Sequence, residues 1–178
     1  MSGWKPGDPK RDTRSMVRVD QAGEFGATRI YAGQLAVLGD RSPAARAIAG
    51  MANQEERHRA FFDSMMARRS VRPTLLAPLW DVAGFALGAV TAALGPNAAM
   101  ACTAAVETEI DKHYEDQLVA LGDSDPELSE AIRDFQAEEV EHRETALAAG
   151  AENTPGYPVL SGLIRLCCKV AIATAKRI

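Results

Sequence analysis

Hydrophobic residues recur at helical spacing along four long stretches of the chain, 14–38, 43–65, 107–121 and 126–146. In the second stretch the inward positions are separated alternately by three and four residues, which is typical of a helix in a bundle. These positions are Ile48, Met51, Glu55, His58, Phe62 and Met65. The fourth stretch shows the same spacing at Leu128, Ile132, Phe135, Glu139, His142 and Ala146. The pattern predicts an all-α protein built on a four-helix bundle.

Turn-forming residues separate the predicted helices at equivalent places in the two halves. Gly39 ends the first helix, and Ser42 is a good N-cap with Pro43 at the first helical position. Gly122 and the pair Asp125–Pro126 repeat this arrangement in the second half. We therefore expect two similar helix pairs, each joined by a short connection.

The two halves share more than their turns, because seven residue types recur 83 positions apart. The first copies are Tyr31, Gln34, Leu35, Leu38, Gly39, Asp40 and Pro43, and the second copies are Tyr114, Gln117, Leu118, Leu121, Gly122, Asp123 and Pro126. A glutamate, Glu24 or Glu107, precedes each tyrosine by seven residues. The repeat predicts an internal two-fold symmetry of the bundle.

The repeat slips by one residue in its second half. Pro43 precedes Glu55 by twelve residues, whereas Pro126 precedes Glu139 by thirteen. A single-turn π-bulge in the fourth helix would absorb the extra residue, and such bulges are frequent at functional sites. A later start of the fourth helix would absorb it equally well, and the sequence leaves both possibilities open.

Each half also contains a Glu-x-x-His motif, which places both side chains on one helix face. The motifs and the upstream glutamates supply Glu24, Glu55, His58, Glu107, Glu139 and His142. Four carboxylates inside a bundle would repel one another, and each buried charge is costly. Two divalent cations would balance them, so the pattern predicts a two-metal site. Oxygen and imidazole donors without thiolate favour iron or manganese.

Several residues beside these candidate ligands have two interpretations each. Asp111 either orients a ligand histidine or is a solvent-exposed acid. Tyr31 and Tyr114 either bond to the site or pack in the core, and packing is the preferred interpretation. Gly23 and Gly26 flank Glu24 and either open a substrate path or allow close helix contact.

Composition narrows the class of protein. The chain has 178 residues, of which 47% are hydrophobic and 6% aromatic, which favours a single helical domain over 15–178. A net charge of −4 without a long basic run argues against nucleic-acid binding. One isolated and two adjacent cysteines form no disulfide framework, which favours a reducing compartment. Residues 1–14 have no apolar signal core and are expected to form a flexible tail.

Two apolar segments lie outside the four-helix pattern. The first, about 73–100, is almost uncharged, but it contains Gly84, Gly88, Gly95 and Pro96. We expect a hydrophobic helix on the bundle or in the membrane interface in preference to a membrane span. The second, about 159–176, is a basic amphipathic helix with Arg165, Lys169 and Lys176. It is either interfacial or an ordinary packed helix.

Several segments resemble the 5-demethoxyubiquinone hydroxylases of coenzyme Q biosynthesis. They are 18–24 (RVDQAGE), 29–34 (RIYAGQ), 72–74 (RPT), 78–80 (PLW), 84–88 (GFALG) and 99–107 (AMACTAAVE). The resemblance runs from about residue 17 to the C-terminus and is more specific than the ligand set alone.

This resemblance implies a di-iron monooxygenase on a ferritin-like bundle. It would hydroxylate the ring of a polyprenylated demethoxyubiquinol with O₂ and electrons traced to NADH. The six candidate ligands match the family's iron ligands, with Glu55 and Glu139 as the bridging pair. His113 and Tyr114 match a pair that the family is thought to use near the quinone and the reductant, and Lys112 stands where the family often has another histidine.

The resemblance also implies partners and a location. We expect a peripheral position on the cytoplasmic face of a bacterial inner membrane and a lipid-binding accessory protein, and the sequence leaves open whether the protein forms a homo-oligomer. Two other functions share these residues. One is a ferritin-like iron oxidase or store, and the other is a non-catalytic carrier of quinone or lipid.

Overall fold

In the computed structural model, which describes residues 12–40 and 42–177, the chain forms six α-helices and no strand. The helices are α1 (Thr13–Leu38), α2 (Pro43–Arg69), α3 (Ala77–Ala93), α4 (Pro96–Leu121), α5 (Pro126–Ala148) and α6 (Tyr157–Ala175). A short 3₁₀ turn, η1 (Ala151–Asn153), lies between α5 and α6. The all-α prediction is therefore confirmed.

The predicted flexible tail covers residues 1–14, and residues 1–11 lie outside the part of the chain that the structure describes. Within the described part, α1 already begins at Thr13. The Asp12 side chain accepts a hydrogen bond from the amide of Ser15. Residues 13 and 14 therefore belong to the helix and not to a tail.

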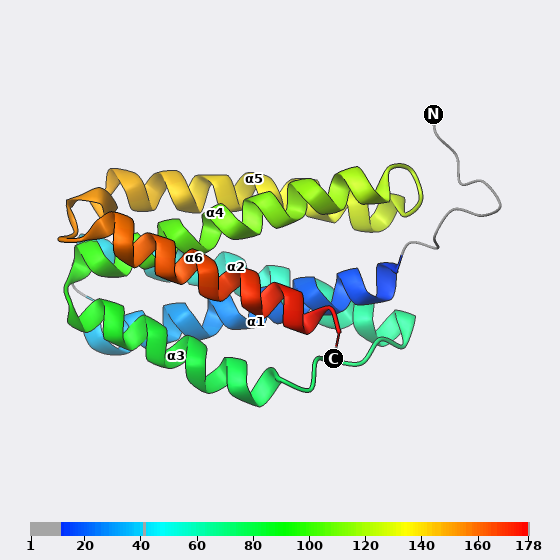
Figure 1. Ribbon diagram of the computed structural model, residues 1–178, viewed down its shortest axis with the longest axis horizontal. Helices are drawn as coiled ribbons and strands as arrows, with labels where there is room; N and C mark the ends of the chain where they lie inside the picture. Colours follow the sequence, from blue (N-terminus) through cyan, green and yellow to red (C-terminus); the bar gives the residue numbers. More distant parts are fainter. Residues whose placement is uncertain (1–11, 41, 178) are drawn as a thin grey trace.

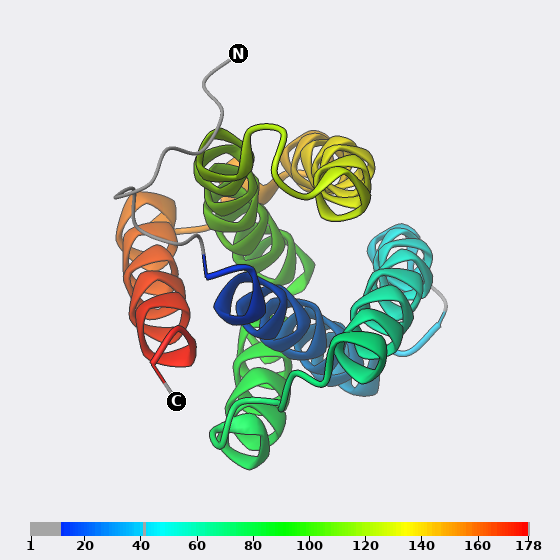
Figure 2. The same ribbon diagram turned by 90° about the vertical axis from the view of Figure 1, so that its right-hand side faces the viewer.

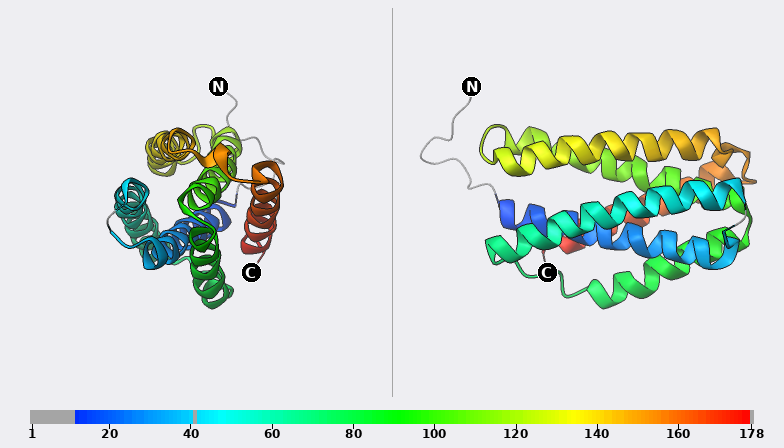
Figure 3. Two further views of the ribbon diagram at one scale, coloured as in Figure 1. Left: turned by 90° about the vertical axis from the view of Figure 1, so that its left-hand side faces the viewer. Right: turned by 180° about the vertical axis from the view of Figure 1, so that it is seen from behind.

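Helices α1, α2, α4 and α5 form a ferritin-like four-helix bundle (Figures 1 and 2). Within the bundle, α1 packs against α2, and α4 packs against α5; α1 also has an extensive contact with α3. The two pairs face each other across the bundle axis. Helix α3 lies outside the bundle on α1, and α6 lies outside it on α4 (Figures 2 and 3).

The expected caps fix the helix ends. Ser42 accepts a hydrogen bond from the amide of Ala45, and Asp125 accepts one from the amide of Leu128. Gly39 and Gly122 follow α1 and α4 with positive φ angles of 68° and 51°. Glycine adopts this backbone region without a steric penalty. The sequence repeat thus appears as two helix pairs with equivalent ends.

The one-residue slip has a different origin from both sequence hypotheses. Helix α5 is α-helical throughout, so the π-bulge prediction is wrong. Helices α2 and α5 both begin at their proline, so a later start is also wrong. The first turns of α5 instead bury two neighbouring rows of side chains, one with Leu128 and Ala131 and the other with Ser129 and Ile132. The row of Ser129 and Ile132 continues to Glu139. The buried face is therefore wider by one residue, which accounts for the extra residue before Glu139.

The apolar segment divides into two elements with different environments. Gly95, with φ at 118°, and Pro96 end one helix and begin the next. Helix α3 lies on the surface of the bundle, whereas residues 98–107 begin α4 and are all buried. The predicted insert of about 73–100 therefore extends too far, because its last residues belong to the bundle.

Two glycines allow α3 to approach α1 closely. A Cβ atom at Gly88 would lie 1.9 Å from the carbonyl oxygen of Ile30, and one at Gly33 would lie 2.1 Å from that of Phe85. Real Cβ atoms do not approach backbone oxygens so closely, so a larger residue would push the helices apart. Gly88 of the apolar segment and Gly33 of α1 thus serve helix packing.

Helix α6 has two distinct faces. Ile164 and Ala175 are buried, and Arg165 forms an ion pair with the buried Glu109 of α4 at 2.6 Å. The opposite face exposes Val159, Leu163, Leu166 and Val170. By length and composition alone, α6 is also long enough and apolar enough to cross a membrane. It packs on the bundle and leaves an apolar stripe uncovered.

Candidate metal centre

Six side chains from all four bundle helices meet at the centre of the bundle. Glu24 comes from α1, Glu55 and His58 from α2, Glu107 from α4, and Glu139 and His142 from α5. Each is 1% exposed or less. The structure thus brings together all six residues that the sequence repeat singles out, at positions where a bundle usually has leucine or isoleucine.

The six residues form two overlapping groups that could each hold a metal ion. One group is Glu24, Glu55, His58 and Glu139, and the other is Glu55, Glu107, Glu139 and His142. Within each group the candidate ligand atoms lie within 4.8 Å of one another. Glu55 and Glu139 belong to both groups. Two neighbouring cations with two shared carboxylates would require this arrangement.

Buried polar atoms without hydrogen-bond partners give an independent test of this fit. Among the described residues they include Glu24 Oε2, both oxygens of Glu55, His58 Nδ1, Glu107 Oε2 and Glu139 Oε1. Unpartnered buried polar atoms are costly, and native proteins rarely retain them without a function. All of these atoms lie in one cluster, and they are carboxylate oxygens and an imidazole nitrogen, which are types of ligand that bind iron. The residues present therefore fit a pair of divalent cations.

The protonation of the cluster reflects its burial. Desolvation and the neighbouring Glu139 raise the pKa of Glu55 well above its usual value, and the same two causes raise the pKa of Glu107. Burial disfavours a charged His58, but the adjacent carboxylates of Glu139 and Glu24 raise its pKa to about 10. The two adjacent histidines outweigh desolvation and lower the pKa of Glu139 to about 2. Without a cation, the site therefore retains protons.

Both histidines turn Nδ1 toward the carboxylates. His58 Nδ1 lies 3.2 Å from Glu139 Oε1 and 3.5 Å from Glu24 Oε2. His142 Nδ1 lies 3.2 Å from Glu55 Oε1 and 3.2 Å from Glu139 Oε2. The ring of His58 is also stacked on Phe135, with centroids 4.0 Å apart. The Nδ1 atoms are therefore the ones that would bind metal.

The two repeated tyrosines exchange partners between the halves. Tyr31 donates a hydrogen bond of 2.6 Å to Glu107 Oε1, and Tyr114 donates one to Glu24 Oε1. Each tyrosine therefore holds the upstream glutamate of the other half. The preferred sequence interpretation, core packing, is incomplete, because both rings are buried but both hydroxyl groups contact the site.

Two residues that the sequence analysis did not select contact the outer nitrogens of the histidines. Glu138 Oε2 lies 3.0 Å from His58 Nε2, and Gln54 Oε1 lies 2.9 Å from His142 Nε2. Asp111, the residue considered for this role, contacts Gln136 and Arg143 instead. A signal was present in the sequence, because a polar residue directly precedes the glutamate of each Glu-x-x-His motif.

His113 lies away from the six candidate ligands, in the wall between α4 and α1. Its Nε2 atom is 3.1 Å from Oδ1 of the buried Asp20, whose Oδ2 accepts a hydrogen bond of 2.8 Å from Gln117. Burial raises the pKa of Asp20. His113 also borders a surface hollow of about 390 Å³ between α4 and α6, together with Lys112, Lys169 and Lys176.

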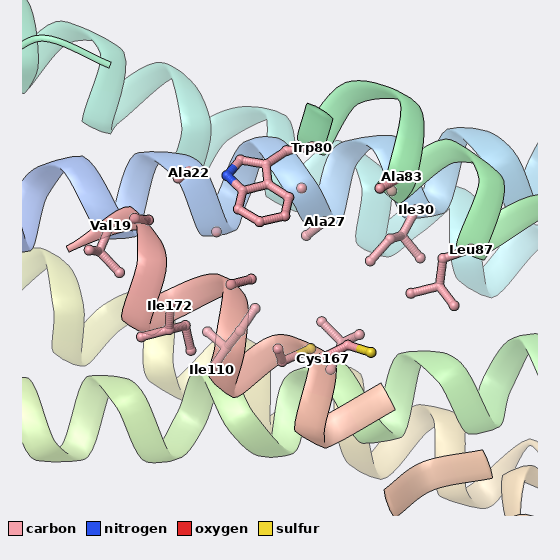
Figure 4. A pocket seen from close by; sticks show the side chains of 17 residues that line it. Val19, Ala22, Ala27, Ile30, Trp80, Ala83, Leu87, Ile110, Cys167 and Ile172 are labelled. Atoms are coloured by element: carbon pink, nitrogen blue, oxygen red, sulfur yellow. The ribbon is translucent and has the colours of Figure 1, made fainter. Parts of the chain in front are cut away.

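An apolar cavity of about 180 Å³ lies between α1, α3, α4 and α6. Figure 4 shows Ile30, Trp80 and Ile172 lining it from three different helices. Gly23 and Val106, the neighbours of Glu24 and Glu107, also line it. A Cβ atom at Gly23 or Gly26 would touch nothing within 4 Å, so these glycines widen the cavity and do not serve helix contact.

We expect metal affinity to rise with pH. Metal must displace protons from Glu55, Glu107 and His58, whose pKa values are all raised. Each proton that the metal displaces raises the apparent metal affinity about tenfold per pH unit. We therefore expect metal affinity to rise at least about tenfold per pH unit between about pH 6 and about pH 8. Competition with a chelator of known pH dependence measures it. An affinity independent of pH would show that these groups carry no protons to displace.

Comparison with known proteins gives a consistent family relationship. A model of the family described as ubiquinone biosynthesis protein COQ7 matches residues 11–175. A 3-demethoxyubiquinol 3-hydroxylase of Rhodospirillum rubrum is 54% identical over 175 residues, covering 97% of this chain and 82% of that protein. The mitochondrial NADPH-dependent 3-demethoxyubiquinone 3-hydroxylase of Mus musculus is 49% identical over 91% of this chain and 76% of that protein. The mitochondrial 5-demethoxyubiquinone hydroxylase of Saccharomyces cerevisiae is 41% identical over 92% and 77%.

Proposed function

The chain belongs to the ubiquinone biosynthesis protein COQ7 family, and from this premise we propose that it is a di-iron monooxygenase. Its substrate is the ring of a polyprenylated demethoxyubiquinol, on which a ring hydrogen is replaced by a hydroxyl group. The observation that carries the proposal is the buried cluster of four glutamates and two histidines with unpartnered atoms.

The iron ligands are Glu24, Glu55, His58, Glu107, Glu139 and His142. When bound, a pair of iron ions would supply the redox chemistry and Lewis acidity needed to activate O₂. The protein fixes the ligand geometry before the reaction. Tyr114 holds Glu24, and Tyr31 holds Glu107, so the two upstream carboxylates keep their orientation.

The apolar cavity between α1, α3, α4 and α6 is the proposed place for the quinol. Gly23 and Val106 bring its wall next to Glu24 and Glu107. The lining is almost entirely hydrocarbon, which suits an isoprenoid chain and excludes water from the ring. This cavity favours a quinol hydroxylase over a ferritin-like iron store, because an iron store needs no apolar chamber beside its metal site.

Electrons come from a nicotinamide reductant, as the name of the mouse relative states for that protein. The sequence has no glycine fingerprint of a dinucleotide-binding fold. The hollow between α4 and α6 gathers Lys112, Lys169 and Lys176, which would attract the phosphates of a nicotinamide dinucleotide. His113 borders this hollow and contacts Asp20, so it would lie between the reductant and the bundle interior.

Isotope labelling tests the reaction. The Fe(II)-loaded protein is incubated with a demethoxyubiquinol analogue, a reductant and ¹⁸O₂, and the product is analysed by mass spectrometry. We expect one ¹⁸O atom in the quinol ring. Iron oxidation without dependence on the quinol would favour an iron oxidase or store, and quinol binding without O₂ consumption would favour a carrier.

We further propose that the protein sits on a membrane surface through α3 and α6. Leu79 and Val82 of α3, and Leu163 and Val170 of α6, are exposed on the two helices that border the cavity. Exposed apolar side chains on neighbouring helices are typical of a membrane-contacting surface. A polyprenyl quinol could then enter the cavity directly from the bilayer.

Replacing Val170 with glutamate should weaken binding to phosphatidylcholine vesicles by about tenfold or more, because it removes apolar contact and adds a charge. Vesicle co-sedimentation measures the partition coefficient. Val119→Glu is the matched control, since Val119 is an exposed valine on α4, outside α3 and α6. Equal loss in both variants would contradict the proposed surface.

A further inference from the structure

The ligand histidines receive their outer hydrogen-bond partners from the opposite half of the chain. Glu138 of α5 contacts His58 of α2, and Gln54 of α2 contacts His142 of α5. Each partner directly precedes the glutamate of its own Glu-x-x-His motif. The same helix position therefore supports the metal site twice, but with different side chains.

These contacts decide which ring nitrogen is free to bind metal. A carboxylate oxygen and an amide oxygen accept hydrogen bonds, so each Nε2 atom carries the proton. When a metal displaces the Nδ1 proton, this atom has the lone pair that binds, and it is the atom that lies among the glutamates. Gln54 and Glu138 thus fix the tautomer and the ring orientation of the two histidines.

The two acceptors differ in charge, although the rest of the arrangement is repeated. A carboxylate accepts a stronger hydrogen bond than a neutral amide and makes the imidazole a better electron donor. Arg57 lies 3.0 Å from Glu138 Oε2, but its side chain is 61% exposed and its charge is screened by solvent. On both sides a tyrosine holds the upstream glutamate. The Glu138–Gln54 difference is therefore a difference in charge between two otherwise equivalent contacts.

We propose that Gln54 and Glu138 are positioning residues that make the two metal positions unequal. The position formed by Glu24, Glu55, His58 and Glu139 binds its ion more tightly than the position formed by Glu55, Glu107, Glu139 and His142. This inference rests on the proposed two-metal function and adds an order of binding to it.

Binding of Co²⁺ alone, followed by visible absorption and chelator competition, tests the inference without measuring activity. The wild-type protein should bind two ions in two steps whose affinities differ by about tenfold. Glu138→Gln should weaken the tighter step by about tenfold and bring the two steps together. Gln54→Glu should strengthen the weaker step, and the double exchange Gln54→Glu/Glu138→Gln should restore two unequal steps.

Glu141→Gln is the matched control, because it makes the same charge change at an exposed position of α5. Equal affinity of the two ions in the wild type, or the same binding curve for Glu138→Gln and Glu141→Gln, would overturn the inference while leaving the two-metal site intact. Failure of the wild type to bind two ions would instead refute the proposed function. A merely structural role for Glu138 would weaken both steps together, which also overturns the inference.

Discussion

Alanine in place of Glu139 is expected to lower the rate of ring hydroxylation by about 10³-fold or more, because a bound metal contributes several kcal/mol to such a reaction. Glu139 belongs to both candidate metal groups and contacts both histidines at 3.2 Å. Its loss removes a carboxylate from each position at once. The measurements are product formation in the ¹⁸O₂ assay and the number of metal ions bound per chain.

Glu141→Ala is the control for this prediction, because Glu141 is exposed on the same helix two residues away. Glu139→Gln preserves the size of the side chain and removes its charge. We expect Glu139→Gln to lose metal while the protein still folds, which separates a ligand role from a packing role. Two tightly bound ions and normal turnover in Glu139→Ala would contradict the assignment of Glu139 as a shared ligand.

A large loss of stability is expected from Gly33→Ala. The added Cβ atom would lie 2.1 Å from the carbonyl oxygen of Phe85 and 2.8 Å from the amide nitrogen of Ala89, and neither backbone atom can rotate away. Helix α3 must therefore move off α1, at a cost of about 3 kcal/mol. This cost corresponds to a fall of about 6–12 °C in the unfolding temperature of the metal-loaded protein, measured by calorimetry.

Gly50→Ala provides the opposite control. Gly50 lies exposed within α2, and its added Cβ atom would meet nothing within 4 Å. Replacing a helix glycine with alanine stabilises a protein by about 0.5–1 kcal/mol, so the unfolding temperature should rise slightly. Because α3 supplies Trp80 and Leu87 to the apolar cavity, Gly33→Ala should also raise the KM for the quinol. Equal unfolding temperatures in the two variants would show that α3 is not held against α1 by this contact.

Helix ends and helix faces were predictable from sequence because their causes are local. The caps at Ser42 and Asp125 act on amides three residues away, and the glycines at 39 and 122 need only their own φ angles. The inward register of Glu55 and His58 follows from the helical period alone. These short-range rules sufficed to select the six residues that meet in the bundle.

Contacts between helices were not predictable in the same way. The π-bulge hypothesis failed because it sought the cause of the slip within one helix, whereas a wider buried face of α5 absorbs it. Tyr31 and Tyr114 each bond to a glutamate of the other half, and Gln54 and Glu138 each contact a histidine of the other half. Both arrangements depend on which helix faces which across the bundle. The division of the apolar segment at Gly95 likewise depends on the bundle, which buries the start of α4 and leaves α3 on its surface.

For this protein, the sequence by itself determined the four bundle helices, the turns that join each pair, and the six acidic and imidazole side chains that point inward. The tertiary structure alone decided which outer residue supports which histidine, where the apolar cavity lies, and how α3 and α6 cover the bundle. The reason is physical: the period and the caps of a helix arise from interactions within a few residues. The partner of a side chain across a bundle depends instead on the rotation and spacing of helices that are distant in the chain.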